Sequence, residues 1–164
     1  PPSRCDDMRF EHLVEINDPG NPMIPVLTRR QVWAGLLRRA EDPVPFLPGL
    51  QRCTVLDRGA GSLDRLLAFQ GADIRDRVTW EEDLWMRFAV TGPAEHAGST
   101  LTITLEEPAP GHLFLRFAYR TRLGESSGDP DASYAEFVKS AYHESDVDTV
   151  RMIRVLAADA LHPH

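Results

Sequence analysis

Apolar and polar residues alternate with a period of two over residues 51–123, and this alternation predicts β-strands. The expected strands cover residues 51–58, 62–70, 73–80, 84–91, 99–107 and 111–122. Short turns are expected at residues 71–72, 81–83 and 108–111, where glycine, proline and acidic residues interrupt the alternation. The segment MRFEHLVEIN alternates in the same way and predicts a further strand near the start. Together these segments predict an antiparallel meander.

Helical periodicity flanks this meander on both sides. Thr28 and Gln31 have the spacing of a capping box and open a short helix that ends near residue 40. A longer helix is expected over residues 129–161, with Asp129 as its N-cap and Pro130 at its first position. Its apolar residues recur at steps of three and four, so one face must be buried, and the sheet is the only surface large enough.

Length and charge narrow the class of protein. The chain has 164 residues, and we expect one domain over residues 8–164 after a disordered leader at residues 1–7. A formal net charge of −7 disfavours a nucleic-acid partner, which requires a positive surface. The two cysteines, Cys5 and Cys53, favour a reducing compartment, and the sequence shows neither a membrane span nor a signal peptide. We therefore expect a cytoplasmic protein.

One face of the expected sheet is apolar and should lie under the long helix. Its members are Leu63, Leu67, Phe69, Ile74, Val78, Trp80, Leu84, Met86, Phe88, Val90, Leu101, Ile103, Leu105, Leu113, Leu115, Phe117 and Tyr119. Arg65 and Asp76 interrupt this face, and a turn at residues 71–72 would make them diagonal neighbours. They are either a buried ion pair or a polar group in an apolar pocket. His12 is a third polar residue on an apolar strand face.

The order of strand, short helix, meander and long helix, together with particular segments, resembles a known superfamily. The segments are FEHLVEIN, TRRQVWAGLLRRAEDPVPFLPG, STLTITLEEP, HLFLRFAYR and FVKSAYHESDVDTVRMIR. They resemble the SRPBCC or START-like helix-grip superfamily, and more narrowly its AtaL-like branch. The resemblance implies an α+β fold in which a curved antiparallel sheet of about six to seven strands grips the C-terminal helix. It also implies a pocket between them for an apolar or amphipathic small molecule, without selecting an activity.

Three functions follow as alternatives. The first is binding of a small hydrophobic molecule by a pocket lined by residues from sheet and helix, namely Arg65, Asp76, Trp80, Phe88, Phe117, Tyr119, Phe137, Ala141 and Met152. The second is a cyclase, dehydratase or isomerase acting on a polyketide-like or aromatic substrate. Asp76 or His12 would then move a proton and Arg65 would stabilise an oxyanion. Pairing with Arg65 would make Asp76 a poor base.

The third function is a protein contact through the opposite, convex face of the sheet. Trp85 and Phe114 lie there among arginines, a composition typical of an interface and also of a plain solvated sheet, so a homodimer is one alternative. We expect no metal, because His143 and Glu144 point apart on the helix, and no cofactor. The acids in residues 144–148 are interpreted as a solvated face, with Asp148 and Arg151 as an ion pair.

Overall fold

The computed structural model describes residues 7–94, 97–122 and 132–161, with side chains for residues 8–94, 97–121 and 139–161. β1 (Asp7–Glu15) precedes α1 (Arg29–Glu41), and α2 (Ala132–Leu161) follows the last strand. The strands between the helices are β2 (Leu50–Gly59), β3 (Ser62–Phe69), β4 (Ala72–Glu81), β5 (Trp85–Gly92), β6 (Thr100–Ala109) and β7 (His112–Arg122). These elements confirm the predicted strands and helices. The predicted N-cap of α2, Asp129, lies outside the described residues.

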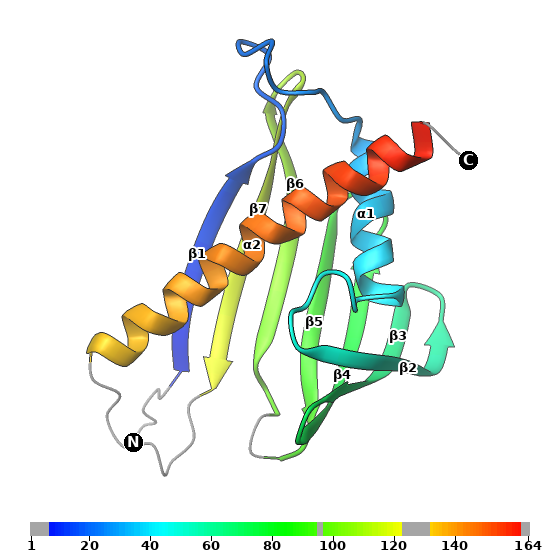
Figure 1. Ribbon diagram of the computed structural model, residues 1–164, viewed down its shortest axis with the longest axis vertical. Helices are drawn as coiled ribbons and strands as arrows, with labels where there is room; N and C mark the ends of the chain where they lie inside the picture. The colour runs from blue at the N-terminus through cyan, green and yellow to red at the C-terminus, as the bar shows by residue number, and fades with distance from the viewer. Residues whose placement is uncertain (1–6, 95–96, 123–131, 162–164) are drawn as a thin grey trace.

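The strands form one seven-stranded sheet in the order β1-β7-β6-β5-β4-β3-β2, with every neighbouring pair antiparallel. α2 crosses one face of this sheet diagonally, and its C-terminal half lies beside α1 (Figure 1). The predicted helix-grip architecture is therefore confirmed. β1 already includes Asp7, which the sequence analysis assigns to the leader.

The face of the sheet under α2 is apolar, as the alternation predicts. Its fully or nearly buried residues are Leu63, Leu67, Val78, Met86, Phe88, Leu101, Ile103, Leu105, Leu113, Leu115 and Phe117. Val32, Leu36 and Ile153 from the two helices complete the same core. Leu84 is an exception, because it lies in the turn before β5 and is exposed.

One turn differs from the prediction, and the difference changes a register. Phe69 pairs with Ala72, so the β3–β4 turn consists of Gln70 and Gly71 rather than residues 71–72. Gly71 has φ of +83°, the left-handed conformation that glycine adopts without steric strain. Moving the turn by one residue places Arg65 directly opposite Asp76 instead of diagonal to it.

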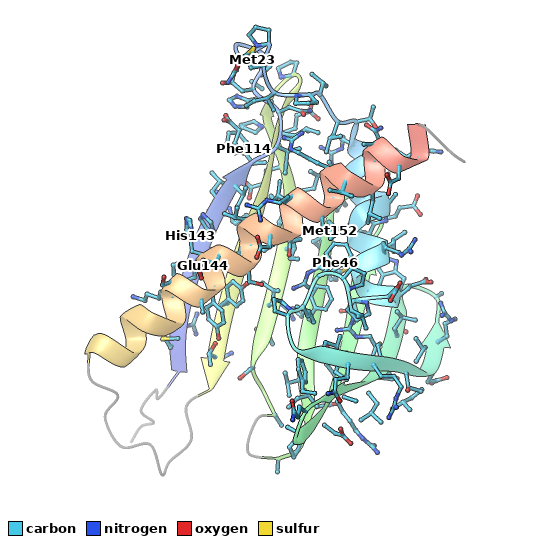
Figure 2. All side chains as sticks on the ribbon, in the orientation of Figure 1. Met23, Phe46, Phe114, His143, Glu144 and Met152 are labelled. Atoms are coloured by element: carbon cyan, nitrogen blue, oxygen red, sulfur yellow. The ribbon has the colours of Figure 1, made fainter. Side chains whose placement is uncertain are left out.

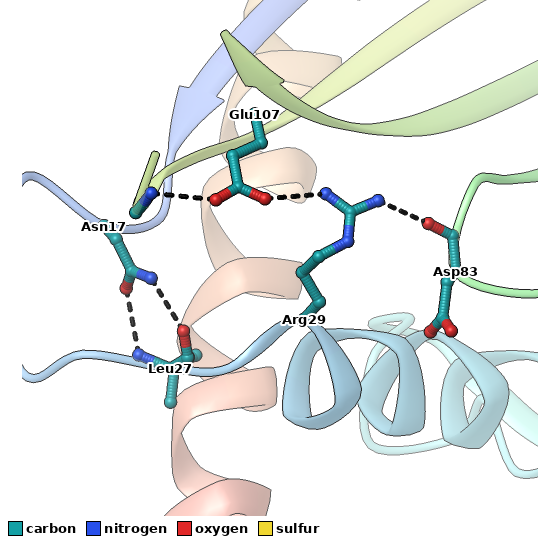
Figure 3. A network of polar contacts seen from close by, with 6 residues as sticks. Asn17, Leu27, Arg29, Asp83 and Glu107 are labelled. Atoms are coloured by element: carbon teal, nitrogen blue, oxygen red, sulfur yellow. Dashed lines mark hydrogen bonds and ion pairs between the residues drawn. The ribbon is translucent and has the colours of Figure 1, made fainter. Parts of the chain in front are cut away.

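The entry to α1 is fixed to the far end of the sheet. The capping box is confirmed, since the Gln31 backbone N–H donates to Thr28 Oγ1 at 3.0 Å and the Thr28 N–H donates to Gln31 Oε1 at 2.8 Å. Arg29 donates to Glu107 Oε1 at 3.2 Å and to the carbonyl of Asp83 at 2.8 Å (Figure 3). These contacts join α1 to the β4–β5 and β6–β7 turns.

A second part of the same network holds the connection between β1 and α1. The side chain of Asn17 donates to the Leu27 carbonyl at 2.7 Å and accepts from the Leu27 N–H at 2.9 Å (Figure 3). The loop between them extends outward, and Met23 at its tip is 85% exposed (Figure 2). The amide of Asn17 therefore closes this loop in the way a short strand pair would.

Candidate functional site

A group of polar side chains lies between the inner face of the sheet and the two helices. This interior polar cluster consists of His12, Arg39, Arg65, Asp76, Tyr119, Asp146 and Thr149. Arg39, Arg65, Asp76, Asp146 and Thr149 are buried, and the other two are partly buried. Buried polar groups of this kind need partners, so each hydrogen bond in the cluster constrains what the cluster can do.

Arg65 and Asp76 form a two-bond ion pair. Arg65 Nε donates to Asp76 Oδ1 at 2.8 Å, and Arg65 Nη2 donates to Asp76 Oδ2 at 2.6 Å. Arg65 Nη1 also donates to the Ala40 carbonyl at the end of α1, at 2.8 Å. The buried pair therefore joins β3, β4 and α1. Asp76 has both oxygens occupied by a guanidinium, which makes it a poor candidate for a general base.

Asp146 is the second buried carboxylate of the cluster, and it comes from α2. Asp146 Oδ1 accepts a short hydrogen bond from the Tyr119 hydroxyl, and Oδ2 lies 3.1 Å from His12 Nδ1. Burial raises the pKa of Asp146, and burial beside this carboxylate raises the pKa of Tyr119 further above its usual value. The carboxylate thus connects the C-terminal helix to strands β1 and β7.

Aromatic rings surround this carboxylate. His12 stacks on His143 with ring centroids 4.1 Å apart, and Tyr119 stacks on Tyr142 at 3.8 Å. The Tyr142 hydroxyl lies 2.6 Å from Thr121 Oγ1. His143 and Glu144 are neighbours on α2 (Figure 2), and His143 faces His12 across the stack.

Arg39 approaches the cluster from the last turn of α1. Its side chain is 5% exposed, and its Nε donates to Thr149 Oγ1 over a long 3.4 Å. Its Cζ lies 4.7 Å from the centre of the Phe88 ring. Burial lowers the pKa of Arg39 to about 10, so the side chain is still cationic at neutral pH.

The remaining residues predicted to line a pocket have different environments. Phe88 and Phe117 are buried, Trp80 and Met152 are partly buried, and Ala141 is exposed. The Phe137 side chain lies outside the described residues. The lining set as a whole stays a prediction.

Two grooves flank α2 at the edge of the interior. One, of about 240 Å³, lies between α2 and the proline-rich segment 43–48 and is lined by Phe46, Met152 and Val155 among others; Phe46 and Met152 are labelled in Figure 2. The other, of about 470 Å³, lies between α1 and α2 beside Gly35 and Ala157. Met152 therefore borders a groove on the side of α2 that faces segment 43–48.

The convex face carries charge pairs around its aromatic residues. Arg116 donates to Glu106 at 2.6 Å and to Glu11 at 2.9 Å, and the tilted rings of Phe114 and His112 have their centroids 4.5 Å apart. Trp85 and Phe114 are only partly exposed. Much of this face is therefore already paired within the chain.

One group of side chains could hold a metal ion. Glu15, Asp18 and His112 meet where β1 ends and β7 begins, with their ligand atoms all within 4.8 Å of one another. His112 Nε2 already lies 2.6 Å from Glu15 Oε2. No metal centre is predicted from the sequence, and the local pattern of residues does not reveal this group, because its members come from distant parts of the chain.

Sequence reasoning also misses two central residues of the cluster. Arg39 follows Val32 by seven positions and therefore lies on the buried face of α1. The interpretation of residues 144–148 as a solvated face is wrong for Asp146, which is 1% exposed, although the Asp148–Arg151 pair is confirmed. The available signal was the spacing of Tyr142, Asp146 and Ile153, which share one side of α2.

Cys53 is a free, partly buried thiol, and burial raises its pKa. Within the described ranges, neither helix combines the length and the apolar character needed to cross a membrane.

Comparison with solved structures supports the fold. The di-domain ARO/CYC StfQ of the steffimycin biosynthetic pathway superposes with a TM-score of 0.71 at 11% identity, over 94% of this chain and 52% of that one. The ZhuI aromatase/cyclase from Streptomyces sp. R1128 gives a TM-score of 0.64 at 15% identity, over 96% and 97% of the two chains. Ara h 8.0201 gives 0.60 at 10% identity, over 91% and 99%. At these identities the likeness shows the fold alone, and this chain spans about half of StfQ.

No curated protein matches the sequence. A protein family does, over residues 14–160, which is nearly the whole of the described domain. The chain therefore belongs to the family of acetylaranotin biosynthesis cluster protein L, AtaL.

Proposed function

We propose that this protein binds a small amphipathic molecule between the inner face of the sheet and α2. The observation that carries the proposal is the interior polar cluster itself, in which a few buried polar side chains lie within walls of leucine, phenylalanine and methionine. Small-molecule sites typically combine mostly apolar walls with a few placed polar groups. A groove of about 240 Å³ beside Phe46 and Met152 opens along the same helix.

The family and the structural neighbours are consistent with this role. The family takes its description from a protein of the acetylaranotin biosynthesis cluster. StfQ is described as a di-domain ARO/CYC and ZhuI as an aromatase/cyclase. Those proteins share the sheet and helix between which the proposed ligand lies.

Binding can be tested with the uncharged fluorescent probe N-phenylnaphthylamine. We expect wild-type protein to bind it, and Met152→Trp to weaken binding by about tenfold, because an indole at the groove occupies volume that the probe needs. Ala158→Trp on the exposed side of α2 is the matched control and should bind like wild type. A wild-type protein that neither binds the probe nor carries a ligand in native mass spectrometry would refute the proposal.

A second candidate function is proton transfer on the bound molecule, as in a cyclase, dehydratase or isomerase. The observation that favours it is the buried Asp146 carboxylate between Tyr119 and His12, with its pKa raised by burial. Asp146 replaces Asp76 as the candidate base. His12 stays a candidate, now through its contact with Asp146.

This activity predicts deuterium exchange at the acidic carbon of a β-diketone such as benzoylacetone, followed by NMR in D₂O. Wild-type protein should accelerate exchange above the buffer rate, and Asp146→Asn should remove the acceleration while N-phenylnaphthylamine still binds. Equal rates for wild type and Asp146→Asn would exclude Asp146 as the base. Self-association through Trp85 and Phe114 and a cytoplasmic location stay predictions from the sequence.

A further inference from the structure

The Arg39 guanidinium has no counter-ion of its own in the part of the chain that the structure describes. Among the described residues, no carboxylate oxygen lies within 4.0 Å of it, and its one hydrogen bond goes to the neutral hydroxyl of Thr149 at 3.4 Å. Burying a cation without a direct partner is unfavourable, and buried charges in proteins are normally paired. Arg39 therefore differs from Arg65 and Asp76, the charged pair in this interior whose members neutralise each other.

The neighbouring cation makes the contrast clear. The Cζ atoms of Arg39 and Arg65 lie 4.7 and 5.3 Å from the same Phe88 ring. Arg65 is matched by both oxygens of Asp76 and by the Ala40 carbonyl. Two guanidinium groups thus lie against one aromatic ring, and of the two only Arg65 is paired with a carboxylate.

Asp146 is the carboxylate that could be expected to pair with Arg39. Its Oδ1 accepts from Tyr119 and its Oδ2 is in contact with His12, so neither oxygen is bonded to Arg39. Tyr119 and Asp146 raise the pKa of Arg39 through space, without a hydrogen bond to it. The positive charge of Arg65 lowers that pKa. The positive charge of Arg39 is left available for a group that the described residues do not supply.

Resting on the proposed function, we propose that the ligand is an amphipathic organic anion and that Arg39 binds its charged oxygen group. The planar guanidinium presents paired N–H donors that match a carboxylate or an enolate oxygen. Phe88 lies under the guanidinium and the apolar walls of the core surround it, so the rest of the ligand would be hydrophobic. Such a ligand would supply the missing counter-charge.

The test compares two probes that differ by one charge. Anilinonaphthalene sulfonate carries a sulfonate on the skeleton of N-phenylnaphthylamine, which is uncharged. We expect Arg39→Gln to weaken binding of the sulfonate by about tenfold or more, and binding of the uncharged probe by less than about threefold. Thr149→Val keeps the cation and should retain the preference for the sulfonate. A loss that is equal for both probes, or no loss for the sulfonate, would overturn the inference.

A measurement on wild-type protein keeps the inference testable if Arg39→Gln does not fold. Naphthoate and naphthamide have nearly the same shape and differ in charge. We expect naphthoate to displace N-phenylnaphthylamine at a concentration lower by about tenfold, since only the carboxylate gains the charged contact. Equal displacement by the two would overturn the inference while leaving the proposed binding function intact. Failure of both fluorescent probes to bind wild-type protein, with no ligand in native mass spectrometry, would instead refute the binding function on which the inference rests.

Discussion

The Arg65–Asp76 pair illustrates what single residues reveal in this protein. A charged residue at an inward position of a strand interrupts the alternation, so both members were identifiable from the sequence. Their direct pairing was not, because register depends on which two residues form the β3–β4 turn. The structure turns two candidate site residues into a buried structural contact, and the enzymatic hypothesis loses Asp76 as its base.

Removing one member of this pair should be costly. Asp76→Asn leaves Arg65 charged and buried, so we expect the free energy of unfolding to fall by about 3–5 kcal/mol in urea titrations. The neighbouring cross-strand pair Asp64–Arg77 provides a matched control, since it joins the same strands on the convex face at 3.9 Å. Asp64→Asn should change stability by less than about 1 kcal/mol, because exposed ion pairs contribute little. Similar losses for both variants would contradict a structural role for the buried pair.

Arg39 and Asp146 were missed for a different reason. Charged side chains on helices are usually solvated, and the helix alone does not show which of its faces another layer will cover. Arg39 is buried because α2 and the inner face of the sheet enclose the end of α1, a tertiary effect. Helical spacing carried a signal for Arg39 and Asp146, but the packing of the layers decided that they are buried.

At the scale of elements, periodicity was sufficient for most of the architecture. Alternation with a period of two predicted all seven strands, and a capping box at Thr28 and Gln31 predicted the start of α1. These signals are local, because successive side chains alternate between the two faces of a strand and return to the same face of a helix after three or four residues. The contact between the helices was not predictable in the same way.

That contact depends on Gly35. A Cβ at this position would lie 2.7 Å from Cγ1 of Ile153, a residue that is fully buried on α2. Gly35→Ala adds helix propensity but forces the helices apart, so we expect a net loss of about 1–2 kcal/mol in thermal unfolding. Ile153→Ala should lose less stability in the Gly35→Ala background than in wild type, because it removes both Cγ atoms that the new methyl group would meet. Additive effects would show that the helices do not meet at this point.

The whole molecule adds a question about association. Trp85 and Phe114 lie on the convex face, which no element of the described chain covers. If copies pair through this face, Trp85→Ala and Phe114→Ala should each shift sedimentation toward monomer in analytical ultracentrifugation, because central aromatic residues usually carry interface energy. Both melting temperatures should stay close to wild type, since these side chains lie outside the core. Thr104→Ala on the same face is the control, and a wild-type protein that is monomeric at high concentration would exclude self-association.

The order of strands in the sheet also has a consequence for how the chain assembles as it is synthesised. Within the described sheet β1 pairs only with β7, so β1, which is synthesised before the other six strands, has no partner until nearly the whole meander has followed it. The hairpins from β2 to β7 can form one after another, because each of these strands pairs with the strand that precedes it in the sequence. Ribosome-arrested chains that stop before β7 should therefore protect β2–β5 from proteolysis while the segment at Phe10 is still cut. Nascent β1 is thus the segment of this protein with the longest exposure to chaperones.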